Sequence, residues 1–168
     1  MASYEFFKKE FEFKGKHARM ASELQQLNDY EHTYFKRLID LYVIASVIGF
    51  RVDRKVDEDY SPIEPRSIFP EQMIKAKEDL DFILQMMIML ENGGKLSNEE
   101  CVKLAFRGAE NQEEFVKYQN MFNSYVRGGV EELYERLVIR KADIEDAYSD
   151  DKTANIMALV ERFGRKKV

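Results

Sequence analysis

Few residues in this sequence have the types and spacing that catalysis or metal binding requires. The 168 residues contain two histidines and one cysteine. Asp29 and His32 have the i,i+3 spacing of a carboxylate–histidine pair, whereas a di-iron centre in a helical bundle needs two such pairs and further carboxylates. Phosphate-binding glycine loops, zinc-protease motifs and nucleophile elbows are missing from the sequence. We therefore expect no metal, no cofactor and no catalytic residue.

The start of the chain is basic and carries aromatic side chains. This combination suits single-stranded nucleic acid, because lysine and arginine contact phosphates and aromatic rings stack on bases. A second basic cluster lies at the end of the sequence. The candidate nucleic-acid residues are Lys8, Lys9, Lys14, Lys16, Arg19, Arg165, Lys166 and Lys167. The net charge of the chain is −5, so its acidic remainder repels a phosphate backbone and disfavours nucleic acid as the partner.

A protein partner is the leading expectation, because methionine and aromatic side chains are concentrated at two places. Met86, Met87 and Met89 form one group, and flexible methionine side chains suit a surface that adapts to a partner. Phe7 and Phe11 form the other group, where an amphipathic helix would dock on the body of the protein or on a partner. Core packing is the competing interpretation of the methionines. These five residues are the candidate partner-binding set.

Charged residues inside or beside apolar segments add further hypotheses. Arg37 and Asp40 are three residues apart in an otherwise apolar stretch, so they form either a buried polar pair or an exposed stripe shared with Lys36. Arg54 lies in a charge-dense segment, where pairing with acidic neighbours at the surface is expected. Cys101 follows two glutamates at a predicted helix start and is interpreted as a buried, unreactive side chain.

We expect helices to position these residues, because the composition of the chain disfavours a strand-rich fold. The chain is 45% hydrophobic and 34% charged, with 3 prolines and 8 glycines, which is typical of one globular domain with long helices. Tyr4, Phe7 and Phe11 share a helix face, and a short strand there would lack a partner. We therefore expect a first helix that ends near Lys14–Gly15, and no secure strand.

The segment 29–50 is predicted to be the central helix of a bundle, since it is apolar on two opposite faces. Asn28 and Glu31 have the spacing of a capping box, so residues 16–50 form either one long helix or two. The proline-containing segment 60–68 is interpreted as a loop within the domain, because proline biases its neighbours away from helix.

Proline, glycine and capping signals bound the helices that follow. Pro70 suits a first helical position, and a heptad-spaced apolar seam from Met73 to Leu90 predicts one helix there. A glycine pair then ends this helix. Ser97 and Glu100 have capping-box spacing and predict the start of a short helix.

The last part of the chain is predicted to be helical as well. Asn111 and Glu114 repeat the capping signal, Gly128–Gly129 is expected to end that helix, and Gly164 is expected to end the final one, which starts near Ser149. The predicted fold is all-α, a single-domain irregular helical bundle of about seven or eight helices over residues 1–168, with a mobile tail at 164–168.

Four stretches of the sequence resemble segments of small all-helical accessory proteins that are encoded in bacterial antiviral-defence gene clusters. They are Tyr34–Tyr42, Ile48–Phe50, Ile68–Gln72 and Tyr125–Tyr134. The similarity covers about half of the chain. The resemblance implies an accessory subunit that works beside a larger ATPase or nuclease, and it assigns no functional residue.

These observations favour a non-enzymatic accessory or adaptor protein that acts by helix-surface protein–protein interaction in a bacterial defence system. The expected partner is a larger ATPase or nuclease, or a second copy of the chain in a homodimer. A small helical subunit that contacts nucleic acid is one alternative, and an enzyme with an unrecognised site is another. The longest apolar stretch, 38–50, is too short for a membrane span, and the single cysteine suits a reducing compartment, so we expect a cytoplasmic protein.

Overall fold

The arrangement of the helices is given by a computed structural model that describes residues 4–26, 33–139 and 151–164. Most of the described residues are helical, which confirms the predicted all-α class, and they form a single domain with one small sheet. The helices are α1 (Gly15–Gln25), α2 (Leu38–Arg51), α3 (Pro70–Lys75), α4 (Lys77–Glu91), α5 (Asn98–Arg107), α6 (Gln112–Tyr134) and α7 (Asp151–Phe163). The strands are β1 (Phe11–Phe13) and β2 (Arg66–Ile68), and a π-helical segment, Glu135–Ile139, continues α6.

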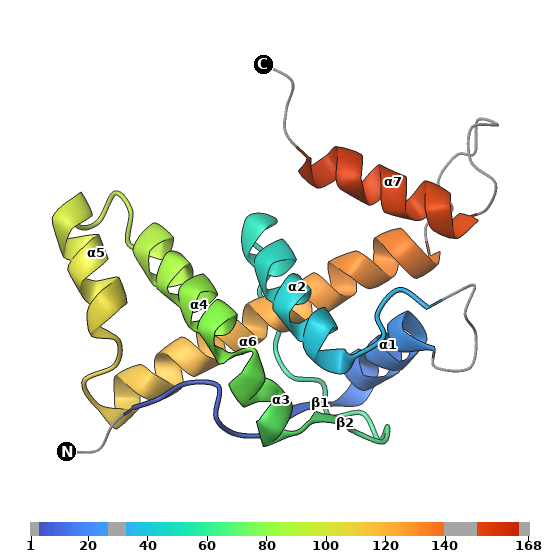
Figure 1. Cartoon of the computed structure of the whole chain (residues 1–168), viewed down its shortest axis with the longest axis horizontal. Helices are drawn as coiled ribbons and strands as arrows, with labels where there is room; N and C mark the ends of the chain where they lie inside the picture. The colour runs from blue at the N-terminus through green and yellow to red at the C-terminus, as the bar shows by residue number, and fades with distance from the viewer. Residues whose placement is uncertain (1–3, 27–32, 140–150, 165–168) are drawn as a thin grey trace.

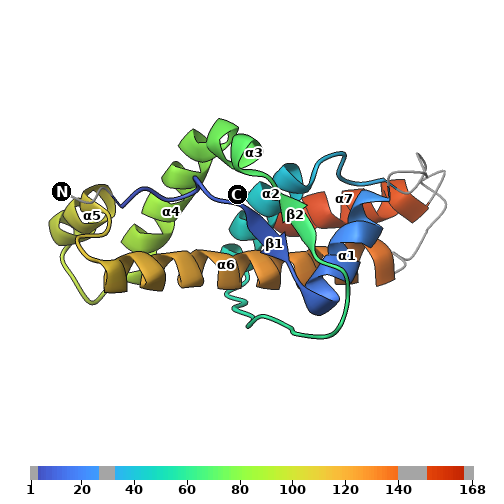
Figure 2. The same cartoon turned by 90° about the horizontal axis from the view of Figure 1, so that it is seen from below.

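The 23-residue helix α6 packs against α1, α2 and α4. Figure 2 shows it running along one side of the molecule, with the other helices and the sheet above it. Helices α4 and α5 form a hairpin near the N-terminal end of α6, and α1 packs near its C-terminal end (Figure 1). Fully buried side chains of α6 and of the helices packed on it meet in one core. They include Leu24, Leu41, Leu80, Phe122 and Leu133.

Helices α2 and α6 touch each other backbone to backbone, because glycines lie where they meet. A Cβ atom at Gly49 would be 1.8 Å from the carbonyl oxygen of Tyr125, and one at Gly129 would be 1.8 Å from that of Ala45. A Cβ atom at Gly128 would also clash with the backbone of Arg54. The prediction that Gly128–Gly129 ends a helix is therefore wrong: α6 continues beyond this pair, and the glycines permit close packing inside the helix.

The predicted first helix is not formed: residues 4–10 are irregular, and Phe11–Phe13 is a strand. Strand β1 pairs antiparallel with β2, with Phe11 opposite Ile68, and Gly15 starts helix α1 instead of ending an earlier one. The expectation of no secure strand is therefore wrong as well. The partner strand lies far along the chain, inside the segment 60–68 that was predicted to be a loop, so local sequence could not reveal it.

The predicted central helix starts later than expected. Residues 33–37 are not helical and α2 begins at Leu38, so the segment 16–50 contains two separate helices. Asn28–Glu31 and Asp29–His32, the capping pattern and the carboxylate–histidine pair, lie outside the described residues. Within α2, Leu41 and Ala45 are fully buried, whereas Ile44 on the opposite side is exposed. Helix α2 is thus enclosed on one side by its neighbours.

Local capping chemistry is confirmed at two helix starts. Ser97 and Glu100 form a complete capping box at α5, with each side chain accepting the other residue's backbone N–H. Asn111 Oδ1 accepts the backbone N–H of Glu114 at 2.9 Å at the start of α6. The prediction of one heptad-spaced helix before α5 is wrong, because Ala76, with φ −92° and ψ 0°, separates α3 from α4.

Candidate functional site

The basic residues of the first segment lie beside carboxylates and do not form one open patch. The ion pairs are Lys8–Glu5, Lys14–Glu58, Lys16–Glu131 and Arg19–Glu23. Lys9 is exposed, and Arg165, Lys166 and Lys167 lie outside the described residues. Because a carboxylate accompanies each of these four cations, the segment presents little net positive potential to a phosphate backbone. The structure adds no support to the nucleic-acid alternative.

The carboxylate of Glu131 in α6 gathers groups from two distant segments. Its Oε1 lies 2.8 Å from Lys16 Nζ and 3.1 Å from His17 Nε2, and its Oε2 lies 2.9 Å from Arg54 Nη2. We call these four residues the Glu131 cluster. Burial alone would raise the pKa of Glu131, but hydrogen bonds from Lys16 and His17 bring that pKa below its ordinary value. The carboxylate is therefore charged at neutral pH although it is only 6% exposed.

Arg54 extends the Glu131 cluster along α6. Its guanidinium also contacts Glu135 at 2.8 Å and Glu132 at 3.3 Å. The expectation that Arg54 pairs with acidic neighbours in its own segment is wrong, because the chain turns toward α6 after α2 ends. Sequence reasoning missed this cluster. The i,i+4 spacing of Glu131 and Glu135 could have indicated it. This spacing places two carboxylates on one helix face, where a basic side chain would stabilise them.

His17 is a buried structural group whose tautomer follows from its partner. An ionised carboxylate only accepts hydrogen bonds, so Nε2 carries the proton that it donates to Glu131. Nδ1 is then an unprotonated acceptor, and among the described residues no donor reaches this buried atom. At 1% exposed, His17 is out of reach of a substrate. The Glu131 cluster therefore holds α1, the segment after α2 and α6 together.

The buried His17 makes stability depend on pH. Burial is the largest influence on its pKa and lowers it below the ordinary 6.5, although the hydrogen bond from His17 to Glu131 opposes this. Because the unfolded chain binds the proton more readily, stability is greatest above about pH 6.5 and is lost as the pH falls toward the folded-state pKa. We expect the melting temperature to fall on acidification from pH 7, and less so in a His17→Gln variant.

The measurement is a series of thermal melts by circular dichroism, together with an NMR titration of the His17 imidazole. The imidazole should titrate below pH 6.5 in the folded protein. An imidazole that titrates at or above its ordinary value, or a His17→Gln variant with an unchanged pH profile, would contradict this account of the burial.

Arg37 and Asp40 form an exposed ion pair and not a buried one. Arg37 Nη2 lies 2.8 Å from Asp40 Oδ1, and the arginine side chain is 63% exposed. The exposure of this pair and of Lys36 agrees with the alternative interpretation, although Lys36 and Arg37 precede α2. Exposed pairs of this kind contribute little to stability, because water and salt screen them. Cys101 is buried, as expected, and no described feature activates it.

The five candidate partner-binding residues differ in accessibility. Met87 is fully buried, and Phe7 is buried with its ring against that of Phe122 at 4.8 Å. These two side chains therefore belong to the core, as the competing interpretation of the methionines predicted for Met87. The half-buried members are Phe11, Met86 and Met89.

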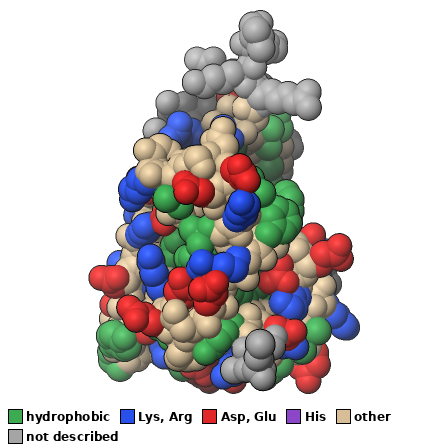
Figure 3. Space-filling model, turned by 90° about the vertical axis from the view of Figure 1, so that its left-hand side faces the viewer, with side chains coloured by type: hydrophobic (Ala, Val, Ile, Leu, Met, Phe, Trp, Pro, Cys, Tyr) green, Lys and Arg blue, Asp and Glu red, His purple; other side chains and the backbone are tan. Residues whose placement is uncertain are grey.

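Helix α4 is apolar on the face turned away from the core as well as on its buried face. Phe82 is 68% exposed and Leu90 is 58% exposed. Met86 and Met89 lie between them along the helix and are partly buried, with contacts to the edge of the core. We call these four residues the outer face of α4. Phe106 on the neighbouring helix α5 is 70% exposed. Figure 3, which views the molecule from the side of α5, shows hydrophobic side chains in several clusters among charged ones.

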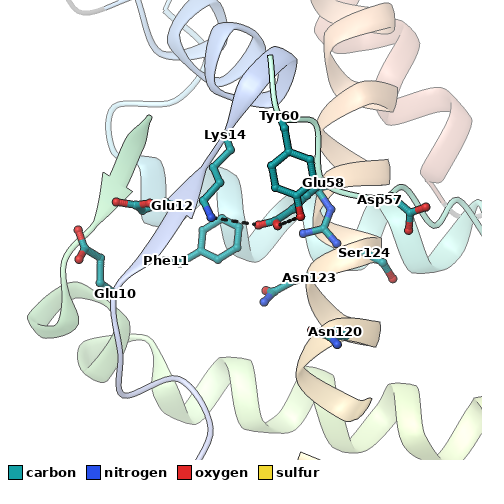
Figure 4. A pocket seen from close by; sticks show the side chains of 11 residues that line it. Glu10, Phe11, Glu12, Lys14, Asp57, Glu58, Tyr60, Asn120, Asn123 and Ser124 are labelled. Atoms are coloured by element: carbon teal, nitrogen blue, oxygen red, sulfur yellow. Dashed lines mark hydrogen bonds and ion pairs between the residues drawn. The ribbon is translucent and has the colours of Figure 1, made fainter. Parts of the chain in front are cut away.

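A polar cavity of about 750 Å³ lies where β1, residues 57–60 and α6 meet (Figure 4). Lys14 and Tyr60 both interact with the carboxylate of Glu58 at this site. The remaining walls are formed by Glu10, Phe11, Glu12, Asp57, Asn120, Asn123, Ser124 and Arg127. Within the described parts of the chain, no cluster of histidine, cysteine and carboxylate side chains is suited to hold a metal ion.

Comparison with known proteins gives no relative from which a function could be transferred. No protein-family model, no curated protein and no solved structure significantly matches the chain. Within residues 4–26, 33–139 and 151–164, no helix combines the length and the apolar character needed to span a lipid bilayer.

Proposed function

We propose that this protein is a non-enzymatic accessory or adaptor protein that binds a protein partner through the outer face of α4. The observation that carries the proposal is the apolar character of both faces of this helix. A helix that is hydrophobic nearly all round is normally covered on every side. Here the core covers Leu80, Leu84 and Met87, and no described element covers Phe82.

The chemistry of the outer face suits an interface. Phenylalanine and methionine are enriched in the buried centres of protein–protein interfaces, and methionine adapts its shape to a partner at small cost. Phe82, Met86 and Met89 are spaced four and three residues apart, so they align along one side of the helix. A partner helix laid along this stripe would bury all three side chains together.

The partner we propose is a larger ATPase or nuclease of the kind that accessory subunits assist, and a second copy of this chain is the other candidate. The resemblance to accessory proteins of antiviral-defence gene clusters supports the first of these. The few basic side chains left without a carboxylate beside them disfavour nucleic acid as the main partner. The role proposed for the chain is therefore to dock on another protein.

The proposal is tested by photo-crosslinking from position 82. A protein with p-benzoylphenylalanine in place of Phe82 should form one defined adduct with a second polypeptide in an extract of the source organism. A Met86→Glu substitution in the same protein should reduce this adduct at least tenfold, because a buried carboxylate without a partner costs several kcal/mol. Mass spectrometry then identifies the second polypeptide and distinguishes another protein from a second copy.

The matched control carries the same crosslinker at Val160, an exposed apolar position on α7. Equal yields of the same adduct from positions 82 and 160 would show indiscriminate hydrophobic contact and would remove the proposal. Because Phe82 is largely exposed, a Phe82→Glu variant that carries the crosslinker at Leu90 instead should keep the stability of the wild type within about 0.5 kcal/mol. Loss of the adduct in that variant therefore cannot be attributed to unfolding.

A further inference from the structure

Within the described residues, strand β1 is paired along one edge only. That edge forms the ladder with β2, and in such a ladder every second residue directs its N–H and C=O groups away from the partner strand. No group of the described residues hydrogen-bonds to these outward backbone groups of β1. An unpaired edge is a template on which a further extended chain can add through backbone hydrogen bonds.

The polar cavity runs along this free edge. Its walls include three consecutive residues at the start of the strand, Glu10, Phe11 and Glu12. Successive side chains of a strand point to opposite faces of the sheet, so a cavity that touches all three lies beside the strand edge and not over one face. Figure 4 shows β2, in green, on the far side of β1 from Asn120 and Asn123. An added strand would therefore lie between β1 and α6.

The opposite wall of the cavity offers side-chain amides to the outer edge of such a strand. Asn120 and Asn123 lie about one helical turn apart on α6 (Figure 4). Asn123 Oδ1 accepts a hydrogen bond from Tyr42 at 2.7 Å, which leaves its amide nitrogen as a donor to the cavity. The exposed side chain of Asn120 forms no hydrogen bond with any described residue. A peptide backbone carries donors and acceptors along both edges, so it suits a strand on one side and amides on the other.

The charge of the cavity favours a basic peptide. Four carboxylates line the cavity against two cations; the carboxylates belong to Glu10, Glu12, Asp57 and Glu58, and the cations to Lys14 and Arg127. Glu58 already interacts with Lys14 and Tyr60, whereas no described cation forms an ion pair with the other three carboxylates. The excess of negative charge attracts lysine and arginine side chains. It also disfavours a second copy of this chain, whose β1 would place glutamate against glutamate.

We propose that an extended basic segment of another protein binds here as a third strand on the free edge of β1. Glu10 and Glu12 are two residues apart, so basic side chains at every second position of the added strand would lie beside both of them. Backbone hydrogen bonds supply affinity in this mode of recognition, and the cross-strand ion pairs supply specificity. The inference is independent of the docking role of α4 and uses none of the residues of its outer face.

The test uses a short capped peptide in which lysine and valine alternate. In a ¹H–¹⁵N NMR titration of the full chain, this peptide should shift the backbone amide signals of residues 10–14 and the side-chain amide signals of Asn120 and Asn123. A peptide with glutamate in place of each lysine should bind at least tenfold more weakly, because its charge is reversed. The lysine peptide with methylated backbone nitrogens should lose affinity to the same degree, because it keeps its charge but has no N–H groups for the ladder.

Three results would overturn the proposal. The first is equal affinity for the lysine and glutamate peptides, or no binding at millimolar peptide. The second is full affinity of the methylated peptide, which would mean that charge alone holds the peptide. The third is a set of shifts that bypasses residues 10–14.

Paired variants separate the free edge from the general charge of the chain. Glu10→Gln/Glu12→Gln changes two exposed side chains, so the protein should remain folded and bind the lysine peptide at least tenfold more weakly. The control, Glu99→Gln/Glu113→Gln, removes the same charge from exposed positions that do not line the cavity, and it should change the affinity by less than about twofold. An equal loss in both variants would reduce the binding to net charge and contradict strand addition at β1.

Discussion

An alanine at Gly129 is expected to destabilise the fold by about 3 kcal/mol, although alanine is the better helix former by about 1 kcal/mol. The added Cβ would lie 1.8 Å from the carbonyl oxygen of Ala45 and 2.7 Å from its Cα. Both of these atoms belong to the backbone of α2, so no side-chain rotation relieves the clash. Helices α2 and α6 would have to separate, and the core between them would lose its close packing.

Urea unfolding followed by circular dichroism at 222 nm measures this loss. The matched control is Gly94→Ala, because Gly94 has φ +85° and no neighbouring atom within 4 Å of its added Cβ. Only backbone strain acts there, and we expect a loss of about 1 kcal/mol. If Gly129→Ala proved as stable as the wild type, the clash could cost no more than the about 1 kcal/mol that the helix propensity of alanine supplies, and the close backbone contact between α2 and α6 would be refuted.

The capping signals at Ser97 and Asn111 could be predicted from the sequence because their partners lie three residues away. Capping is local chemistry, and the fold has no need to bring those groups together. The all-α class was predictable for a similar reason, since helical periodicity repeats within each segment. Helix ends were less certain where a glycine was the only signal.

The Gly128–Gly129 pair shows why glycine alone was ambiguous. A glycine satisfies a helix end through its backbone freedom, and it also permits two backbones to approach closely within a helix. The second role depends on Ala45 in α2, which is far away in the sequence. Strand β1 was missed for the same reason, because its partner β2 follows more than fifty residues later, and a short strand without a partner is unstable.

The candidate sites were still harder to predict, because each joins segments that are distant in the sequence. The cavity takes Phe11 from β1, Tyr60 from the segment after α2 and Arg127 from α6. Nothing in the spacing of these residues relates them. The outer face of α4 was partly predictable, since three methionines within four residues indicated it, but Phe82 could be recognised as exposed only once the core was known.

Removal of the carboxylate at Glu131 is the second large effect that we expect. A Glu131→Ala substitution should lower the free energy of unfolding by about 3 kcal/mol, at the lower end of the range for a broken buried ion pair. Lys16 and Arg54 are partly exposed and can regain water, which limits the loss. His17 cannot do so, because it is 1% exposed and its Nε2–H would lose its acceptor.

Urea unfolding at pH 7 measures this loss, and Glu99→Ala is the control. Glu99 pairs with Lys103 at 2.9 Å, but both side chains are more than 70% exposed, so its removal should cost less than about 0.5 kcal/mol. A Glu131→Ala variant within that same margin would show that the cluster does not hold the helices together.

A double-mutant cycle assigns the loss to the pair of Glu131 and Arg54. If the two charges stabilise the fold through each other, Arg54→Ala should cost much less in a protein that already carries Glu131→Ala than in the wild type. Arg54 would keep its contacts with Glu132 and Glu135, so the coupling should be partial, at about 1 kcal/mol. Strictly additive losses would mean that Arg54 acts through Glu132 and Glu135 alone, and that Glu131 is held by α1.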